Sequence, residues 1–375
     1  MLSNDGRVNP SSAITGQSGS ATGPLRLGLL VGDGIGREIV PATRRTVDTA
    51  AGGAPVEWVE LPIGADAIAS HGTPIPDETL DGLARLDGWI LGPHDSAAYP
   101  EEFRGTLTPG GRIRKRFGLY ANIRPARAFP GVRAAVPGMD LVIVRENSEG
   151  FYADRNMHTG SGEFMPTPDV ALAVAVFTRR ACERIAHTAC ALAAHRRGAV
   201  TVVHKANVLP LTTGLFRDVC LEVAAQYPGV RVDTEHVDAM AAHLVRRGAD
   251  FDVVVTENMF GDILSDLAGE LSGSLGTAPS LNASDSQAMA QAAHGAAPDI
   301  AGRNRANPTA LMLSAAMLLD WLASRRADDG LARAAGRIRS AVADTLAAGV
   351  ATADLGGLAS TAEFTETVGA RILRR

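Results

Sequence analysis

The sequence predicts an α/β protein with a largely parallel sheet. From residue 25 onward, short apolar segments of strand length alternate with amphipathic segments of helical length. Strands that alternate with helices form parallel sheets whose faces the helices cover. Several of the apolar segments are rich in β-branched residues, for example residues 251–256 (FDVVVT). A chain of 375 residues is long enough for two domains or one large α/β unit at ~150 residues per domain.

The expected elements follow one another along the chain. Residues 1–24 are rich in Ser, Gly, Thr, Asn and Pro and are interpreted as a disordered extension. We expect strands over residues 25–31, 56–61, 88–91, 141–144, 199–204, 230–236 and 251–256. Helical patterns over residues 310–325 and 331–348 give the C-terminal end a more helical character.

Composition excludes several classes of protein. With 36 basic and 41 acidic side chains the net charge is −5, and no basic stripe indicates a nucleic-acid partner. The longest apolar stretch, residues 310–319, is shorter than the ~18 residues of a membrane span and is expected to be a buried helix. The three cysteines form no CxxC pair, which favours a cytoplasmic protein in a reducing compartment.

A glycine-rich turn, residues 32–36 (GDGIG), follows the first expected strand. Dinucleotide-binding Rossmann turns have the spacing GxGxxG, and here the third glycine comes one residue early. We therefore interpret this segment as a structural turn and look for a cofactor site elsewhere.

Acidic residues suggest a metal site. Asp262 and Asp266 are four residues apart, so on a helix both carboxylates project from one face. A hard divalent cation such as Mg²⁺ or Mn²⁺ would compensate their repulsion, although an exposed acidic helix edge is the alternative. Asp238 follows another expected strand end and could converge with them, because ligands of α/β sheets bind at the carboxyl ends of strands.

Basic residues suggest a proton carrier and a carboxylate site. Only two of the basic residues are lysines, and Lys205 ends an expected strand, where a lysine with a lowered pKa can carry protons. Arg112, Arg114 and Arg116 alternate in one segment, and Arg124 and Arg145 follow in two others. Such a cluster of arginines could bind a di- or tricarboxylic acid through bidentate pairs. Tyr152 is a candidate proton donor. For each of these residues, a solvated surface position or a packed core position remains the alternative.

Residues 294–308 (HGAAPDIAGRNRANP) combine small residues, an Asp and an Asn-Pro turn. Small residues let the backbone approach a ligand, and an acidic side chain can accept hydrogen bonds from ribose hydroxyls and repel a 2′-phosphate. By composition alone, this segment is a loop that suits a nucleotide.

Taken together, these segments resemble the metal-dependent β-decarboxylating dehydrogenases, which act on isocitrate, 3-isopropylmalate, homoisocitrate and tartrate. The resemblance runs from about residue 25 to the C-terminus. It depends on the motifs GDGIG, LYANIRPAR, VRENSEGFY, HKANVL, VDAM, FGDILSDLAG, HGAAPDIAG with NPTALMLSAAML, and DLGG. RENSEG and HKANVLPLTTGLF are closest to the isocitrate and homoisocitrate branches.

The resemblance implies a two-domain α/β fold that is not a classical Rossmann domain, and a homodimer with shared active sites. Residues 25–119 and 273–375 would form the large cofactor-binding domain. Residues 120–272 would form the smaller domain, with the metal site and the dimer interface.

Residue roles also follow from the resemblance. Arg114, Arg124 and Arg145 would hold the malate carboxylates, and Asp262 and Asp266 would bind Mg²⁺ or Mn²⁺ together with Asp238 of the partner subunit. Lys205 of the partner subunit would take the hydroxyl proton, and Tyr152 would protonate the enol after decarboxylation. The cofactor would be bound by His294, Gly295, Ala297, Asp299, Ile300 and Asn307.

Asp299 follows the pattern of NAD users, so NAD is the expected cofactor. Gln291 and Ala296 depart from the Glu and Ser that are usual in the family near this site. Thr108 and Arg112, in the segment before Arg114, could bind a distal carboxylate, which favours an acidic substituent on the malate core.

The expected activity is therefore NAD-dependent oxidative decarboxylation of a 3-substituted (2R)-malate. A tartrate or D-malate dehydrogenase is one alternative. The other is a non-catalytic, nucleotide-binding regulatory subunit. Such subunits typically lose the catalytic Lys or Tyr or a metal carboxylate, and all of these are present here.

Overall fold

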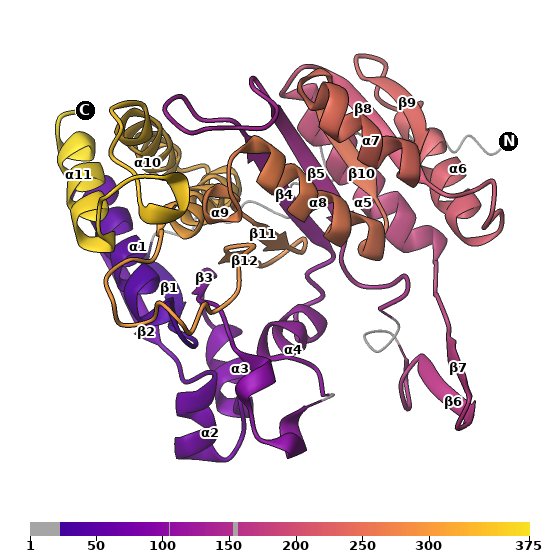
Figure 1. Cartoon of the computed structure of the whole chain (residues 1–375), viewed down its shortest axis with the longest axis horizontal. Coiled ribbons are helices and arrows are strands. Elements are labelled where there is room, and N and C mark those ends of the chain that lie inside the picture. The colour runs from indigo at the N-terminus through magenta and orange to yellow at the C-terminus, as the bar shows by residue number, and fades with distance from the viewer. Residues whose placement is uncertain (1–22, 105, 153–156) are drawn as a thin grey trace, which may run out of the picture.

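The computed structural model describes residues 23–104, 106–152 and 157–375 (Figure 1). Within these residues the strands are β1 (Leu25–Leu30), β2 (Val56–Glu60), β3 (Gly88–Leu91), β4 (Ala121–Arg127), β5 (Asp140–Glu146), β6 (Glu163–Thr167), β7 (Val170–Ala173), β8 (Ala199–His204), β9 (Arg231–His236), β10 (Val253–Thr256), β11 (Leu281–Ala283) and β12 (Ala288–Gln291). The α-helices are α1 (Gly36–Ala51), α2 (Ala65–His71), α3 (Asp77–Leu83), α4 (Pro109–Arg116), α5 (Arg179–Ala194), α6 (Thr212–Ala224), α7 (Val237–Arg247), α8 (Asn258–Ser272), α9 (Thr309–Arg326), α10 (Asp329–Ala347) and α11 (Thr361–Leu373).

One ten-stranded sheet runs through the molecule in the order β2-β1-β3-β12-β11-β4-β5-β10-β8-β9. Its two flanks are parallel, as predicted. One flank pairs β1 with β2 and β3, and β3 with β12. The other pairs β10 with β5 and β8, and β8 with β9. The centre, where β11 pairs with β12 and β4, and β4 with β5, is antiparallel.

The seven predicted strands are all present in the ten-stranded sheet, but its strands β4, β11 and β12 were not predicted, and neither were β6 and β7 outside it. β4 carries Asn122, Arg124 and Arg127 among its seven residues, and β11 and β12 are only three and four residues long. Neither a polar strand nor a very short one shows the apolar run or the clear alternation on which sequence prediction depends. These three strands link the two parallel flanks.

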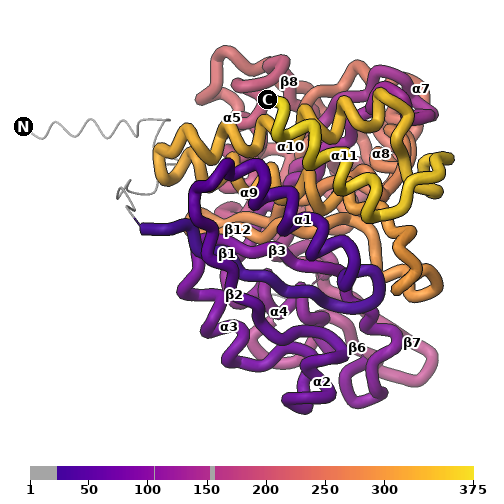
Figure 2. The backbone as a smooth tube through the Cα atoms, turned by 90° about the vertical axis from the view of Figure 1, so that its left-hand side faces the viewer, coloured from indigo at the N-terminus to yellow at the C-terminus, as the bar shows by residue number. Residues whose placement is uncertain are grey.

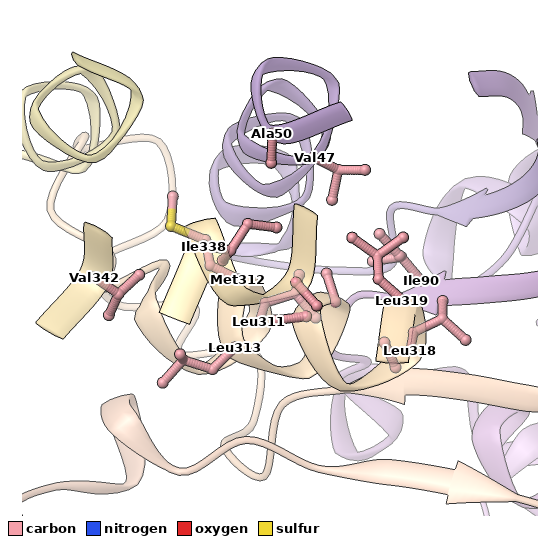
Figure 3. Close-up of a cluster of buried hydrophobic side chains, with 14 of the residues drawn as sticks. Val47, Ala50, Ile90, Leu311, Met312, Leu313, Leu318, Leu319, Ile338 and Val342 are labelled. Atoms are coloured by element: carbon pink, nitrogen blue, oxygen red, sulfur yellow. The ribbon is translucent and has the colours of Figure 1, made fainter. Parts of the chain in front are cut away.

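The flank formed by β1, β2, β3 and β12 is covered on one face by α1, α9, α10 and α11 (Figures 1 and 2). Helix α9 is buried around most of its circumference, since residues 309–316 are all buried, as is typical of a helix inside a core. Figure 3 shows Leu311 and Met312 of α9 close to Val47 of α1 and Ile338 of α10. The buried helix predicted over residues 310–319 is therefore confirmed.

The other flank has a core on each face of the sheet. In β5, Val142 and Val144 belong to the cluster that packs against α5 and α6. Leu141 and Ile143 belong to the cluster that packs against α7 and α8. Because successive side chains of a strand alternate between faces, Arg145 lies on the same face as Leu141 and Ile143, under α8.

The predicted domain boundaries stay a prediction, because the sheet continues from β2 to β9 without a break. Of the predicted extension 1–24, residues 1–22 lie outside the described residues. Among the described residues, no helix combines the length and the apolar character that crossing a membrane requires.

Strands β6 and β7 form a separate two-stranded sheet (Figure 1). Every residue of both strands is exposed, including Phe164, Met165, Val170 and Leu172. Large exposed apolar side chains in one small segment are typical of a surface that binds another protein.

Candidate active site

Helix α8 carries the acidic pair. Glu257 precedes the helix, and its side chain accepts hydrogen bonds from the backbone N–H groups of Met259 (3.0 Å) and Phe260 (2.8 Å), which fixes the start of α8. Asp262 and Asp266 then lie one turn apart on the same face. Their side chains are 36% and 50% exposed, so both carboxylates remain accessible.

Two arginines from the sheet neutralise this pair. Arg145, only 4% exposed, donates from Nε to Asn258 Oδ1 (2.9 Å) and from Nη1 to Asp262. Arg124 donates from Nη1 to Asp266 Oδ1 (2.7 Å). The predicted like-charge pair is thus compensated within the chain.

Close packing of α8 on the sheet requires Gly261. A Cβ atom at this position would lie 2.6 Å from Cγ of Arg145. The glycine therefore lets the helix approach the strand that carries Arg145, and any larger residue would push the two apart.

The two carboxyls of the pair differ in acidity. Burial raises the pKa of Asp262, but the charges of Arg145 and Arg124 outweigh it, so the net pKa lies below the usual value. Burial also raises the pKa of Asp266, and there the opposing charge of Arg124 is too weak to reverse it. Asp262 is therefore the more strongly ionised of the two.

Tyr152 lies beside the same pair. Its hydroxyl donates to Asp262 Oδ2 (2.8 Å), and the Arg145 guanidinium lies 5.6 Å from its ring centroid. Of the predicted residues, Arg124, Arg145, Tyr152, Asp262 and Asp266 are therefore brought together.

Lys205 and Asp238 lie apart from this group. Lys205 follows β8, Asp238 lies in the first turn of α7, and Lys205 Nζ donates to Asp238 Oδ1 (2.5 Å). That hydrogen bond is the main cause of the lowered pKa of Asp238. In the described part of the chain, no three His, Cys, Asp or Glu side chains are grouped so that they could hold a metal ion. Asp238 therefore does not join Asp262 and Asp266 of the same chain, and its convergence with those of a partner subunit stays a prediction.

A polar cavity of about 180 Å³ contains all three predicted arginines. Arg114 lies on its wall and donates from Nη2 to Gln291 Oε1 (3.2 Å). The other polar side chains that line the cavity are His94, Asn122, Asn147, Ser280, Asn282, Gln291 and His294. Of these the sequence analysis singled out only Gln291 and His294. Asn122 and Asn147 occur in the motifs ANIRPAR and RENSEG, so their place beside predicted arginines was a signal for them.

Buried amides set the position of Arg124. Asn122 Nδ2 donates to Ser280 Oγ (2.8 Å) and Asn282 Oδ1 (3.1 Å), and Asn147 Nδ2 donates to the same Asn282 oxygen (3.1 Å). Asn122 Oδ1 then accepts from Arg124 Nε (2.7 Å). A buried hydrogen-bonded network of this kind holds its members in one geometry.

Thr108 and Arg112 do not line this cavity. Thr108 is the N-cap of α4, and its hydroxyl accepts from the backbone N–H of Gly111 (3.1 Å). Arg112 donates to the Ile75 carbonyl (2.9 Å) and to Asp77 (2.9 Å). Of the residues in this segment, Arg114 faces the cavity and Arg112 points toward α3.

A second cavity of about 460 Å³ lies next to the first. Five of the six predicted cofactor residues line it, namely His294, Gly295, Ala297, Ile300 and Asn307. Sequence reasoning missed Ile35, Ser274, Arg305 and Asp354, of which Asp354 belongs to the quoted motif DLGG. His294 and Gly295 line both cavities, so the two spaces adjoin.

Asp299, the sixth predicted cofactor residue, is exposed and lies outside the lining of this cavity. Gln291 lines the polar cavity. Ala296 contributes a backbone carbonyl that accepts from the N–H of Ile35 (2.9 Å).

That contact explains the glycine-rich turn. At Gly34, where φ is 53°, a Cβ would lie 2.1 Å from the Ala296 carbonyl oxygen. The turn therefore packs directly on the loop that carries His294 and Gly295, and Ile35 reaches the larger cavity.

His294 shows how this cavity could hold a ligand. Burial is the main cause of its lowered pKa, so its ring is neutral at neutral pH. Nδ1 lies 3.0 Å from the Gly295 carbonyl, while Nε2 is buried and has no hydrogen-bond partner within the described residues. An unpaired buried nitrogen on a cavity wall suits a ligand that can hydrogen-bond to it.

Comparisons with known proteins agree with this geometry. The family profile described as isocitrate/isopropylmalate dehydrogenase matches residues 26–368. The chain is 44% identical over 344 residues to an isocitrate/homoisocitrate dehydrogenase of Thermus thermophilus, covering 92% of this chain and 97% of the relative. It is 37% identical over 370 residues to the mitochondrial isocitrate dehydrogenase [NAD] catalytic subunit 5 of Arabidopsis thaliana, covering 97% and 94%.

Among solved structures, the isocitrate dehydrogenase of Methylococcus capsulatus superposes with a TM-score of 0.83 at 37% identity, covering 93% of this chain and 99% of that one. These matches extend over nearly the whole chain and include every element that carries the cavities. The chain therefore belongs to the isocitrate/isopropylmalate dehydrogenase family of decarboxylating dehydrogenases.

Proposed function

We propose that the protein catalyses the NAD-dependent, Mg²⁺- or Mn²⁺-dependent oxidative decarboxylation of a 3-substituted (2R)-malate, as a homodimer with shared active sites. The observation that carries this proposal is that Arg114, Arg124 and Arg145 share one small cavity, which adjoins a larger cavity through His294 and Gly295. Hydride transfer needs substrate and nicotinamide side by side, and adjoining cavities meet that need.

The arginines would bind the carboxylates of the substrate. Guanidinium groups form bidentate, charge-assisted hydrogen bonds with carboxylates, and three of them suit a di- or tricarboxylic acid. Arg124 and Arg145 are held by Asn122, Asn258 and the α8 acids, so they are oriented before the substrate arrives.

The side chains on α8 fit a divalent cation. Mg²⁺ and Mn²⁺ prefer oxygen ligands in octahedral geometry, and Asp262 and Asp266 present carboxylate oxygens one helical turn apart. Two carboxylates leave room for oxygens of the substrate and for a further carboxylate. Asp238 of a second copy of the chain is our candidate for that carboxylate, because Asp238 of the same chain is not grouped with the α8 acids.

Exposed apolar side chains lie in the chain near Lys205 and next to Asp262, and they support the proposal of a dimer. Val208 and Leu211, which follow Lys205, are 63% and 86% exposed, and Ile263, next to Asp262, is 60% exposed. Apolar side chains exposed in this way are typical of a surface that another protein covers. Contact between copies at these residues would bring Lys205 and Asp238 of one chain to the α8 acids of the other.

Two residues would move protons. Lys205 of the partner subunit would take the proton of the C2 hydroxyl at Nζ, and Tyr152 would donate its phenolic proton to C3 after the carboxylate has left as CO₂. The tyrosine hydroxyl lies within hydrogen-bond distance of Asp262, at the acidic pair. The residues of the larger cavity would hold NAD, which would supply the hydride acceptor for C2, and Asp262 and Asp266 would hold a cation that would supply stabilisation of the negative charge on the C2 oxygen.

NAD is preferred over NADP because of Asp299. Its exposed carboxylate follows Ala297, which lines the larger cavity, and would accept hydrogen bonds from ribose hydroxyls while repelling a 2′-phosphate. The Arabidopsis relative, which is named as an NAD enzyme, supports the same choice.

The test is NADH formation by the purified protein with Mn²⁺, measured on isocitrate, homoisocitrate, 3-isopropylmalate, D-malate and tartrate. We expect turnover that requires the cation and that strongly prefers one 3-substituted malate. Turnover of tartrate or D-malate alone would favour the dehydrogenases of those acids. NAD binding without turnover of any of the five would contradict catalysis and favour a regulatory subunit.

A further inference from the structure

His94 is a lining residue of the polar cavity that the proposed reaction does not use. It lies three residues beyond the end of β3, and its ring lies against the first turn of α4. A Cβ atom on Gly110 would lie 3.1 Å from Cε1 of His94 and 3.5 Å from Nη2 of Arg114. His94 and Arg114 therefore flank the same point of the cavity wall.

One nitrogen of this ring is buried and unsatisfied. Nδ1 of His94 has no hydrogen-bond partner among the described residues, although it is shielded from solvent. Burial, followed by the charge of Arg114, lowers the pKa of His94 to about 4 against the opposing charge of Asp33. The imidazole is thus neutral at neutral pH, and Nδ1 can donate a hydrogen bond in one of its tautomers.

The lining residues of the cavity come from two parts of the sheet, which form two opposite walls. His94 follows β3 and Gln291 ends β12, which are neighbours in the sheet, and Gln291 accepts from Arg114. Arg124 and Arg145 lie on β4 and β5 beside α8, and β11 separates these strands from β12.

The two walls orient the substrate. The hydroxyl-bearing end of the malate must face the acids of α8, where the cation would bind. The opposite wall, with His94, Arg114 and Gln291, is then available to the remainder of the molecule, which includes the substituent on C3.

We propose that His94 determines specificity for this substituent, donating a hydrogen bond from Nδ1 to a carboxylate on it and thereby selecting tricarboxylic over alkyl-substituted malates. The inference rests on the proposed function. A carboxylate would pair with Nδ1–H and with the nearby Arg114, whereas an alkyl group would leave the buried nitrogen unpaired. Sites that are built to hydrogen-bond a substrate group discriminate strongly against analogues that lack it.

Thr108 and Arg112, which the sequence predicted to bind this substituent, are engaged elsewhere, and this supports the choice of His94. The Thr108 hydroxyl is engaged in capping α4, and Arg112 is paired with Asp77. His94 is the histidine that reaches the cavity on the side of α4, beside Arg114.

The experiment compares kcat/KM for isocitrate, 3-isopropylmalate and D-malate, with NAD and Mn²⁺, in the wild type and in His94→Leu and His94→Asn. D-malate lacks the substituent, so it reports damage that is unrelated to specificity. We expect His94→Leu to reduce kcat/KM for isocitrate at least about tenfold more than for D-malate. His94→Asn, which keeps a donor, should recover part of that loss. If the leucine variant does not fold, the asparagine variant alone should still shift the ratio of isocitrate to D-malate.

A matched control is His71→Leu. This histidine ends α2, contacts Ser70 and Glu78, and lines neither cavity. Its substitution should leave the ratio of isocitrate to D-malate unchanged.

The outcomes separate this inference from the proposed function. An equal loss on isocitrate and D-malate, an unchanged ratio in both His94 variants, or a wild type that prefers 3-isopropylmalate overturns the role of His94 while the decarboxylating activity stands. A wild type that turns over none of the three substrates overturns the proposed function and the inference with it.

Discussion

Charged side chains occupy two regions of this protein in different ways. In the α8 region, defined by Arg124, Arg145, Asp262 and Asp266, the arginines are 15% and 4% exposed and both acids are paired with them. In the Lys205 region, defined by Lys205 and Asp238, the side chains are 25% and 69% exposed and pair with each other.

The two regions differ in how much their charge pairs contribute to the stability of the folded chain. Buried charges need partners, because an uncompensated charge in a protein interior costs several kcal/mol. Exposed pairs contribute about 0–1 kcal/mol to stability. Substitutions in the α8 region should therefore affect both folding and activity. Those in the Lys205 region should affect activity alone.

Lys205→Met tests the exposed region and should show the largest effect. Loss of the proton carrier should lower kcat by about 10²–10⁴-fold. The free energy of unfolding, measured by urea denaturation, should change by no more than about 1 kcal/mol. Turnover near that of the wild type would contradict the role of Lys205.

Mixing two inactive variants tests whether Lys205 of one chain and the α8 region of another form one active site. If Lys205 serves the α8 region of a second copy, a dimer of one Lys205→Met chain and one Tyr152→Phe chain contains one intact site. Random exchange of equal amounts of the two inactive variants should then restore about one quarter of wild-type activity. No recovery, with exchange shown by mass spectrometry, would contradict shared sites.

Arg145→Met tests the buried region. Its removal leaves Asp262, which is 36% exposed, paired with Arg124 alone and leaves Asn258 Oδ1 without a donor. The free energy of unfolding should therefore fall by about 1–3 kcal/mol. The matched control is Arg112→Met, since Arg112 pairs with the 87%-exposed Asp77 and should cost at most about 1 kcal/mol. Equal losses of unfolding free energy in Arg145→Met and Arg112→Met would contradict the view that the α8 region contributes more to stability than an exposed charge pair.

Glu149 extends the buried region toward the base of α8, where its backbone carbonyl accepts from Asn258. Burial, partly opposed by the hydrogen bonds from Thr178, raises its pKa from 4.5 to about 7. The folded state therefore binds the proton more tightly than the unfolded state, so the contribution of this group to stability is fully present below pH 4.5 and is lost as pH rises to about 7.

Glu149→Gln should abolish this dependence. Relative to the wild type, the free energy of unfolding of the variant should rise by about 2–3 kcal/mol between these pH values. Denaturation curves of both proteins at several pH values check the difference. Parallel pH profiles would show that Glu149 titrates normally.

Asp299→Ser tests an exposed acid beside the larger cavity and should show the smallest effect. Without the carboxylate, the ratio of kcat/KM for NAD to that for NADP should fall about tenfold, equivalent to about 1.4 kcal/mol. Stability should stay within about 0.5 kcal/mol of the wild type. An unchanged cofactor ratio would contradict the reason for choosing NAD.

Much of the fold could be predicted from local patterns. The seven apolar strands and the buried helix α9 were predicted because side-chain alternation and all-round hydrophobicity are visible in a single sequence. β4 could not be predicted in this way, because its Asn122 and Arg124 face the polar cavity rather than an apolar core.

Part of the site was also within reach of the sequence. The four-residue spacing of Asp262 and Asp266 placed them on one face of α8. The segment 294–307 carries six lining residues of the larger cavity, of which five were predicted. His94 was missed as a cavity residue, and Gln291 was expected near the cofactor rather than beside Arg114, because their contacts with α4 join segments that are far apart in the chain.

The sequence by itself determined the alternation of strands and helices, the spacing of the α8 acids and the segment 294–307 that lines the larger cavity, because each involves residues that are close together in the chain. Only the tertiary structure decided which arginines share a cavity, that Arg112 faces Asp77, and that Asp238 lies with Lys205 away from Asp262. These outcomes depend on strand order and on the packing of α4, α7 and α8. Such contacts between distant segments leave no local pattern in the sequence.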